Sequence, residues 1–427
     1  MNRFACGLSA ALAFFLLATI STSSDAAERT VVVVMFDGFP PAMIDATSTP
    51  NFDRMKREGV SSRHLVPAYP TNSMANHATF VTGCWPAHHG IMSNIFVDPK
   101  RGRYGDDASV PEDSDWRTGC EAMWQAAERQ GVRSAVFNFV DRWSGTKGKL
   151  ASIVNPEVPW SDHESDDTVL GRGLAELRDN GPNHPRLIAL YFPIPDHVAH
   201  YSGTTAPATE EAVRRCDAIV GKLMAAIKAL PPGREGTLVV GTDHGMMDVG
   251  PLINVGRLMN MYSIKADQAS DGGISLLYLH KGENAARVAT ALGHYGYAFD
   301  VYRKGHYPAF AHLGDGPRAG DILLVAKPPY WFVGPEVMPW WAHALGVTHF
   351  WPVTFVPFTG GLKADHGFSP EIVQMHGIFY AWGASVAKGV AIPRLDMIDV
   401  HPTVMALLGL KPGNPVDGHV VQAALAK

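Results

Sequence analysis

The chain has 427 residues, of which 46% are hydrophobic and 18% are charged. This composition excludes an intrinsically disordered or collagen-like chain and predicts a globular protein with a large core. Lys and Arg number 36 against 41 Asp and Glu, a formal charge of -5, and no basic run is present that could follow a nucleic-acid backbone. A nucleic-acid polymer is therefore not expected to bind through a basic surface.

The first 26 residues have the features of a secretory signal peptide. Arg3 gives a positive start, an apolar run occupies residues 10–20, and the small residues near Ala26 suit cleavage by a signal peptidase. The run is too short for a comfortable membrane span, and no later segment is apolar enough for one. We expect a secreted or periplasmic protein without a stable membrane span, and an N-terminal anchor helix is the alternative.

Cysteines are too few to form a disulfide scaffold. Removal of the signal peptide would leave Cys84, Cys120 and Cys216, which allows at most one bridge and leaves one thiol over. No two of them lie at the spacing of a ligand motif, so a zinc site built on thiolates is not expected. Stability must come from the core.

Short β-branched apolar runs alternate with helical patterns along the chain. The runs that predict strands are, in chain order, residues 31–36, 134–139, 187–192, 237–241 and 377–381. Helices are predicted between them, among them residues 121–130 and 210–229, and residues 393–410 predict a strand, a turn and a helix. Continuous apolar runs are typical of strands buried on both faces. The pattern therefore predicts an α/β fold with a mostly parallel central sheet and helices on both faces.

The character of the chain changes between residues 254 and 363. Periodicity weakens, Gly and Pro are frequent, and two possible strands, residues 274–280 and 321–326, could form a small separate sheet. Residues 330–358 are crowded with aromatic side chains, which are more often a packed core than a ligand surface. They could also provide an apolar wall, a stacking platform for a base or a cage for a quaternary ammonium.

Three carboxylates lie a short distance after predicted strands. They are Asp37, Asp196 and Asp243, and ligands collect beyond the carboxyl ends of the strands in an open parallel sheet. Taken singly, an Asp at such a place is more often a helix N-cap or a turn residue. Three like charges at one edge would repel strongly, which makes a metal cation their natural compensator.

Histidines accompany these carboxylates. His200 follows Asp196 by four residues, on the same face if the segment is helical, and His244 and His366 each stand between an Asp and a flexible Gly. Oxygen and nitrogen ligands without sulfur suit a catalytic zinc or a similar metal. We therefore predict a metal site.

Ser73 is the candidate nucleophile. It lies at the start of a helical pattern that ends at Gly83, where exposed backbone N–H groups favour an alkoxide or a phosphoryl oxygen. A bound metal would lower the pKa of its hydroxyl further. The alternative is that Ser73 merely caps the helix.

In this order, the elements resemble the nucleotide pyrophosphatase/phosphodiesterase family of the alkaline phosphatase superfamily. The resemblance covers most of the chain after the signal peptide. The matching motifs are Phe36-Asp37-Gly38, Tyr69-Pro70-Thr71, Asn76-His77, Val81-Thr82-Gly83, Trp85-Pro86, His89-Gly90-Ile91, Asp196 with His200, and Thr242-Asp243-His244-Gly245-Met246. It implies an alkaline phosphatase-like catalytic domain of residues 27–253 and 364–427, with residues 254–363 as an insert or cap.

The resemblance also implies two divalent metal ions, with zinc as the expected metal. Asp196, His200 and His366 would hold one ion. The other would be held by Asp37, Asp243 and His244 together with the nucleophile, Ser73.

The nucleophile motif departs from the family pattern. The family usually has Thr-Phe-Pro-Asn where this chain has Ser73-Met74-Ala75-Asn76. Serine serves the same chemistry in alkaline phosphatases, so hydrolysis through a covalent phosphoserine is still implied. Asn76 is expected to donate to a non-bridging oxygen, or else to be only a helix-surface amide. Met74 replaces an aromatic residue that can stack on a base in nucleotide-cleaving members, which weakens the assignment of a nucleotide substrate.

Charge favours a diester over a monoester. Three carboxylates against two divalent cations leave a charge of about +1, and an ionised Ser73 brings it to about zero, which suits a singly charged diester. Residues 68–77 contain no Lys or Arg for the extra charge of a monoester, although Arg142 could approach from a later loop. The sequence thus predicts a phosphodiesterase or pyrophosphatase acting on small molecules.

Other activities stay open. Within the superfamily these are a phospholipid-headgroup phosphodiesterase, a phosphomonoesterase, and a sulfatase, whose modification motif begins like Cys84-Trp85-Pro86-Ala87-His88 but needs Arg where His88 stands. A non-catalytic metal-binding protein is the alternative from another class. The presence of every expected ligand and of a hydroxyl at Ser73 argues against it.

Overall fold

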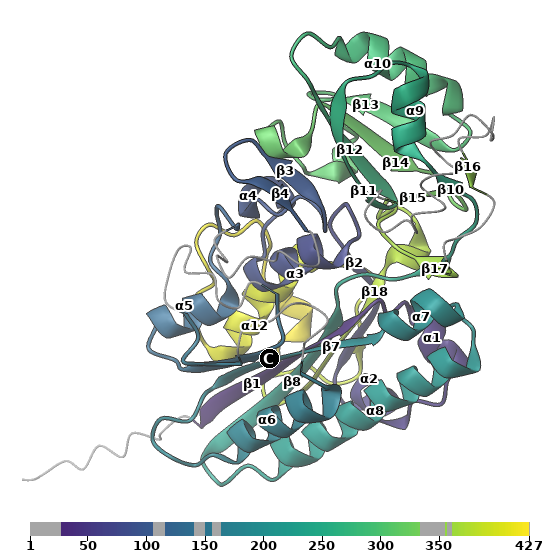
Figure 1. The fold of residues 1–427 in the computed structure, drawn as a ribbon. Helices are drawn as coiled ribbons and strands as arrows, with labels where there is room; N and C mark the ends of the chain where they lie inside the picture. Colours follow the sequence, from purple (N-terminus) through teal and green to yellow (C-terminus); the bar gives the residue numbers. More distant parts are fainter. Residues whose placement is uncertain are drawn as a thin grey trace, which may run out of the picture.

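The structure is a computed structural model that describes residues 27–105, 116–140, 150–155, 164–333, 355–356 and 361–426. The predicted signal peptide, residues 1–26, and Arg142 lie outside these ranges. Within them, no helix is both long and apolar enough to cross a membrane. Figure 1 shows a central sheet with helices on both faces and, above it, a second sheet with its own helices.

The central sheet has the strand order β19-β2-β18-β8-β1-β7-β5-β6, and β20 also pairs with β2. The bounds are β1 Glu28–Asp37, β2 Val60–Val66, β5 Ser134–Phe137, β6 Ile153–Val154, β7 Leu187–Pro195, β8 Arg234–Thr242, β18 Gly377–Gly383, β19 Val390–Ala391 and β20 Leu395–Asp396. β1 lies between β7 and β8 and is parallel to both. β18 is antiparallel to β8 and to β2. The predicted mostly parallel sheet is confirmed, and every predicted strand of it is present.

Burial explains why β1 carries no alternation of polar and apolar residues. Val31, Val33 and Met35 pack into one apolar cluster, with α3 (Ser73–Thr82), α5 (Met123–Arg129) and α12 (Val400–Leu408). The residues between them pack into a second cluster on the other face, with α2 (Pro50–Glu58), α6 (Asp166–Arg178) and α8 (Pro207–Lys228). Both faces of the strand are packed against apolar side chains that exclude water, so polar residues are confined to its ends.

The second sheet has the order β13-β14-β12-β11-β15-β10-β16. The bounds are β10 Leu252–Ile253, β11 Ala266–Gly272, β12 Ile274–Leu279, β13 Phe299–Arg303, β14 Ile322–Ala326, β15 Trp331–Val333 and β16 Phe355–Val356. β12 and β14, the two strands predicted here, pair antiparallel. The sheet begins with β10, before the boundary at residue 254 that the sequence predicts for the insert.

The second sheet packs on both of its faces. α9 (Val255–Met261) and α10 (Ala285–Leu292) pack on the sheet in an apolar cluster. Trp331 and Phe332 of β15 belong to the same cluster. Ile274, Leu276 and Leu323 on the other face join a cluster with Tyr69 and Ala78, which flank the start of α3. Trp331 and Phe332 are therefore core residues. Trp340, Trp341, Phe350, Trp351 and Phe358 of the predicted aromatic segment lie outside the described residues.

Cys84 and Cys120 form a disulfide, and Cys216 is a buried free thiol. The prediction of at most one bridge and one remaining thiol is confirmed. The bridge uses the Cys84 thiol, which a sulfatase would need to modify. The sulfatase alternative therefore loses its motif.

The N-cap residue of α2, Thr49, makes no side-chain hydrogen bond to the start of its helix. Asp217 on α8 provides the cap instead. Its carboxylate accepts hydrogen bonds from the backbone N–H groups of Asn51 (2.9 Å) and Phe52 (3.0 Å) and from the Asn51 side chain (2.8 Å). We predict that Asp217→Ala lowers the free energy of unfolding in urea by about 1–3 kcal/mol, because it leaves the buried Phe52 N–H and the partly buried Asn51 donors without their acceptor.

Glu211→Ala on the same helix is the matched control. The Glu211 side chain is 74% exposed and pairs only with Arg214 in the described residues, so its loss should stay below about 0.5 kcal/mol. Equal losses for the two variants would contradict the capping role of Asp217.

Candidate active site

Three adjacent strands bring three carboxylates to one edge of the central sheet. Asp37 is the last residue of β1, Asp196 directly follows β7 and begins α7 (Asp196–Ser202), and Asp243 directly follows β8. The strands are parallel, so their carboxyl ends meet. Gly38 allows the close approach, because its φ is +58° and a Cβ there would lie 2.4 Å from the Asp196 Oδ1 atom.

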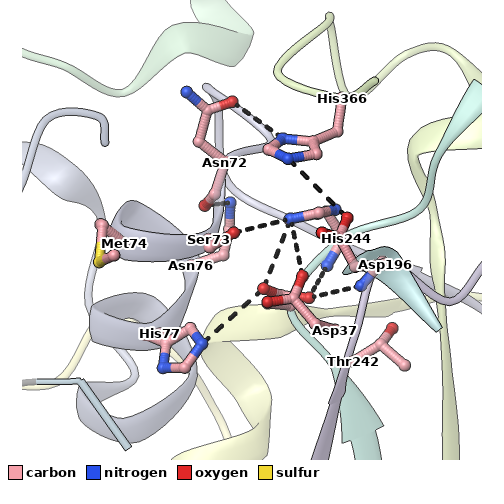
Figure 2. Close-up of polar contacts among 12 residues, drawn as sticks. Asp37, Asn72, Ser73, Met74, Asn76, His77, Asp196, Thr242, His244 and His366 are labelled. Atoms are coloured by element: carbon pink, nitrogen blue, oxygen red, sulfur yellow. Dashed lines mark hydrogen bonds and ion pairs between the residues drawn. The ribbon is translucent and has the colours of Figure 1, made fainter. Parts of the chain in front are cut away.

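Histidines face these carboxylates, and Figure 2 shows His77, His244 and His366 among them. The Nε2 atom of His244 lies 3.3 Å from Asp37 Oδ1 and 3.4 Å from Asp243 Oδ2. His200, one turn after Asp196 on α7, places Nε2 3.1 Å from Asp196 Oδ2, and His366 Nε2 is 3.9 Å from Asp196 Oδ1. The rings of His244 and His366 stack with centroids 3.9 Å apart.

Each carboxylate has one oxygen held by the protein and one without a hydrogen-bond partner. Asp37 Oδ2 accepts from the Tyr191 hydroxyl, Asp196 Oδ2 faces His200, and Asp243 Oδ1 accepts from the Gly38 and His244 backbone N–H groups at 3.1 and 2.8 Å. The remaining atoms are buried and unpartnered: Asp37 Oδ1, Asp196 Oδ1 and Asp243 Oδ2. Buried oxygens of this kind are costly unless a cation binds them.

The raised pKa values of Asp37 and Asp243 show that the nearby protein groups do not fully neutralise these two carboxylates. Burial, and then the charges of Asp243 and Asp196, raise the pKa of Asp37 well above its ordinary value. Burial raises the pKa of Asp243 to about 7. Burial also lowers the pKa of His366 well below its ordinary range, so its imidazole is neutral and keeps a lone pair for a ligand.

The residues fit a metal centre, in an arrangement close to the predicted one. Asp37, Asp243 and His244 place ligand atoms within 4.8 Å of one another, as the second predicted ion requires. The residues of the first predicted set fall into two overlapping groups: Asp196 with His244 and His366, and His200 with Asp365 and His366. Asp365 was not predicted as a ligand.

His200 presents Nε2 to the site because its other nitrogen is occupied. Nδ1 lies 2.8 Å from the Ala364 carbonyl, to which it donates. Burial opposes a charged His200, but the neighbouring Asp196 outweighs it and raises the pKa of His200 to about 10. Without a metal, this imidazole therefore carries the compensating charge itself.

Ser73 lies where the sequence predicts it, at the first residue of α3. Its Oγ atom is 3.2 Å from His244 Nε2, which places the hydroxyl at the edge of the Asp37–Asp243–His244 group. Asn72 is the N-cap residue of the helix, with extended backbone. Ser73 is thus not the cap residue, and its hydroxyl is directed to the site instead.

The predicted role of Asn76 is wrong. Its side chain is fully buried, and its amide nitrogen donates to the carbonyls of Ala68 (3.2 Å), Pro70 (2.9 Å) and Asn72 (3.0 Å). Its Oδ1 atom accepts from the Ala68 N–H at 2.8 Å. Since all its hydrogen-bonding groups are engaged, Asn76 ties down the loop before Ser73 and cannot donate to a substrate.

Asn94 is a site residue that the sequence analysis missed. Its Oδ1 atom accepts from the Met74 backbone N–H at 2.8 Å, so the carboxamide lies beside Ser73 at the start of α3. The side chain is half-buried. Its only signal in the sequence is that Ser93 and Asn94 interrupt an apolar run, which does not predict a contact with residues twenty positions earlier.

Comparisons with known proteins agree with this geometry. The profile of the family described as type I phosphodiesterase / nucleotide pyrophosphatase matches residues 31–377. Ectonucleotide pyrophosphatase/phosphodiesterase family member 7 from Homo sapiens is 27% identical over 412 residues, which cover 93% of this chain and 83% of the relative. Bis(5'-adenosyl)-triphosphatase from Mus musculus is 25% identical over 398 residues, covering 91% and 80%.

The fold is also that of solved structures. Murine ectonucleotide pyrophosphatase/phosphodiesterase 5, solved as an inactive variant in complex with AMP, superposes with a TM-score of 0.79 at 21% identity. The superposition covers 93% of this chain and 100% of that one. Since the profile spans most of the chain, from β1 to the start of β18, this hydrolase of phosphoric ester bonds belongs to the type I phosphodiesterase/nucleotide pyrophosphatase family.

Proposed function

We propose that this phosphodiesterase/pyrophosphatase works with two divalent metal ions and forms a covalent phosphoserine on Ser73. One observation carries the proposal. The Ser73 hydroxyl stands 3.2 Å from His244, whose ring nitrogen faces Asp37 and Asp243, and each of these two carboxylates keeps one buried oxygen without a hydrogen-bond partner. We assign residues 27–253 and 364–427 to the catalytic domain and residues 254–363 to its insert, except that β10, residues 252–253, pairs within the second sheet and goes with the insert.

The ligand sets stay as the sequence predicts them. Asp37, Asp243, His244 and Ser73 would hold one ion, and Asp196, His200 and His366 the other, with Asp365 close to the second set. Zinc is the expected metal because the donors are imidazole nitrogens and carboxylate oxygens without sulfur. When bound, the ions would lower the pKa of the Ser73 hydroxyl and neutralise charge on the phosphoryl and leaving oxygens.

The chain itself positions the reacting groups. The Ser73 oxygen attacks phosphorus, a Ser73 O–P bond forms, and the ester or anhydride bond to the leaving group breaks. The leaving oxygen takes up a proton, and the phosphoryl group on Ser73 still carries the other ester group. Water then cleaves the Ser73 O–P bond, which returns the Ser73 hydroxyl and releases a phosphate monoester. Asn94 takes the role first expected of Asn76: with Oδ1 on the Met74 N–H, its amide protons are free to donate to a phosphoryl oxygen.

A diester or pyrophosphate suits the charge of this site better than a simple monoester. In the described ranges, the ion pairs of Asp37, Asp196 and Asp243 are with histidines only. No Lys or Arg of these ranges is therefore paired with them to supply extra positive charge for a doubly charged monoester. Met74, next to Ser73, is partly buried against the cluster that contains Tyr69 and could accept an apolar ester group.

The names of relatives support nucleotide substrates. The mouse relative is named a bis(5'-adenosyl)-triphosphatase, and the solved family structure holds AMP. Met74 supplies no aromatic ring for a base, which keeps a phospholipid-headgroup diester as the second candidate.

We further propose that the protein is exported. Residues 1–26 have the pattern of a signal peptide, and the Cys84–Cys120 disulfide supports an oxidising compartment such as the periplasm or the cell exterior.

The substrate class can be tested by steady-state kinetics on matched compounds. We expect kcat/KM for a nitrophenyl phenyl phosphodiester to exceed that for nitrophenyl phosphate at least about tenfold, because a near-neutral site does not compensate a doubly charged group. A monoester preference of that size would contradict the assignment. ATP, a dinucleoside polyphosphate and a choline phospholipid, measured at the same pH and metal loading, would separate nucleotide from lipid substrates.

Ser73→Ala is expected to reduce turnover more than about a thousandfold, since it removes the attacking oxygen. The fold and most of the bound metal should remain, because six Asp and His ligands are untouched. Ser73→Thr is the matched control and should keep substantial activity through its own hydroxyl. A Ser73→Ala enzyme with more than about a tenth of the rate would mean that water attacks phosphorus directly.

Removal of the metal ions by a chelator should abolish turnover, and zinc should restore it. In the metal-free protein the raised pKa of Asp243, about 7, means that a proton occupies the site at lower pH. Stability therefore falls as the pH rises from the ordinary range of an Asp carboxyl to about 7, and it levels off above that value. Zinc replaces the proton, so the rise in Tm that zinc causes should be larger at about pH 8 than at about pH 6. An equal rise at both would contradict this account.

A further inference from the structure

A hydrogen-bonded chain of side chains connects the second sheet to His366. Its central member is Asn72, which is fully buried and directly precedes Ser73. The Asn72 amide nitrogen donates to Asp271 Oδ2 at 2.9 Å and to Ser93 Oγ at 3.0 Å. Its Oδ1 atom lies 3.4 Å from His366 Nδ1, as Figure 2 shows.

Asp271 determines which way the Asn72 amide points. The Asp271 Oδ2 atom accepts from the NH₂ group of Asn72, so the carbonyl oxygen of Asn72 is the atom that faces His366. That oxygen in turn only accepts, so His366 must carry its proton on Nδ1. The Nε2 atom, which faces Asp196 Oδ1, then keeps the lone pair.

The backbone holds this arrangement in place. The Gly367 N–H donates to the Thr71 carbonyl at 3.0 Å, and the Gly273 N–H, in the turn between β11 and β12, donates to the His366 carbonyl at 2.9 Å. Gly367 has a φ of +87°, and a Cβ on it would lie 2.3 Å from Asn72 Oδ1. The loop of His366 is therefore clamped between the nucleophile loop and the second sheet.

We propose that Asn72 is a positioning residue for metal binding, and that Asp271 of the second sheet orients it. Together they select the tautomer of His366 whose Nε2 atom can bind a cation. The other tautomer would put a proton on Nε2, toward the metal, and a lone pair against the Asn72 oxygen. This inference rests on the proposed function, since it requires a metal at His366.

Metal binding by variants tests the inference without any use of activity. Asn72→Leu removes the side-chain acceptor of His366 at similar volume and leaves the Thr71 carbonyl as its backbone acceptor. We expect the affinity for one of the two zinc ions, measured by competition with a chelator, to fall about ten- to hundredfold while the other ion is retained. Ser270→Ala is the matched control: it breaks a buried hydrogen bond to Ser275 (2.7 Å) in the same sheet, next to Asp271, and should keep both ions.

A rescue variant separates positioning from a general loss of structure. The double substitution Asn72→Asp with Asp271→Asn keeps an acceptor toward His366 and reverses the donor and acceptor between the two positions. Its affinity for both ions should lie within about threefold of the unchanged protein, or above it.

Two results would overturn the inference: both ions bound by Asn72→Leu as tightly as by the unchanged protein, or a double variant as weak as Asn72→Leu. Should Asn72→Leu fail to fold, Asp271→Ala serves instead, because it leaves the Asn72 amide held only by the Ser93 hydroxyl, which can either donate or accept. It should weaken the same ion by about three- to tenfold, and an unchanged affinity would overturn the inference. Failure of the unchanged protein to bind two ions would count against the proposed function itself.

Discussion

The concentration of unneutralised carboxylates at the end of three buried strands is the constraint on which this site depends. Asp37, Asp196 and Asp243 each lose most of their hydration, and each leaves one oxygen without a hydrogen-bond donor. In the part of the chain that the structure describes, only histidines form ion pairs with them. Such a cluster is unfavourable unless cations enter it, so the residues that shape it also determine which cations bind.

The fold produces this cluster because both faces of the central strand are packed with apolar side chains, so that polar side chains lie at the strand ends. β1 packs against helices on both faces, and its first polar side chain after the apolar run is Asp37 at the carboxyl end. Close approach of backbones then brings the loops together: the Gly245 N–H donates to the Met375 carbonyl at 2.8 Å, which joins the loop of His244 to the start of β18. The second sheet contacts the loop of His366 through the hydrogen bond from the Gly273 N–H to the His366 carbonyl, and so lies against the other side of the site.

The predicted strands and the positions of the proposed metal ligands follow from two local signals, continuous apolar runs and polar residues shortly after them. The direction of β18 does not follow, because an apolar run reads the same in either direction. Asp365 was missed as a possible ligand because its contact with His200 depends on how β17 (Ala364–Asp365) meets α7. The boundary of the insert was placed late because β10 is only two residues long.

The two asparagines near the nucleophile show a further limit. The sequence predicts that Asn76 donates to a phosphoryl oxygen, but its amide is used by the loop of residues 68–72. Asn94 reaches the same helix start from a distant loop, through a single hydrogen bond to the Met74 backbone. Contacts of this kind depend on tertiary packing, which no local pattern encodes.

Anomalous scattering at the zinc absorption edge, from crystals of active protein, tests the central claim most directly. The account predicts two peaks: one among Asp37, Asp243, His244 and Ser73, and one among Asp196, His200 and His366. A fully active protein with no peak, or with a single peak away from the three carboxylates, would contradict it.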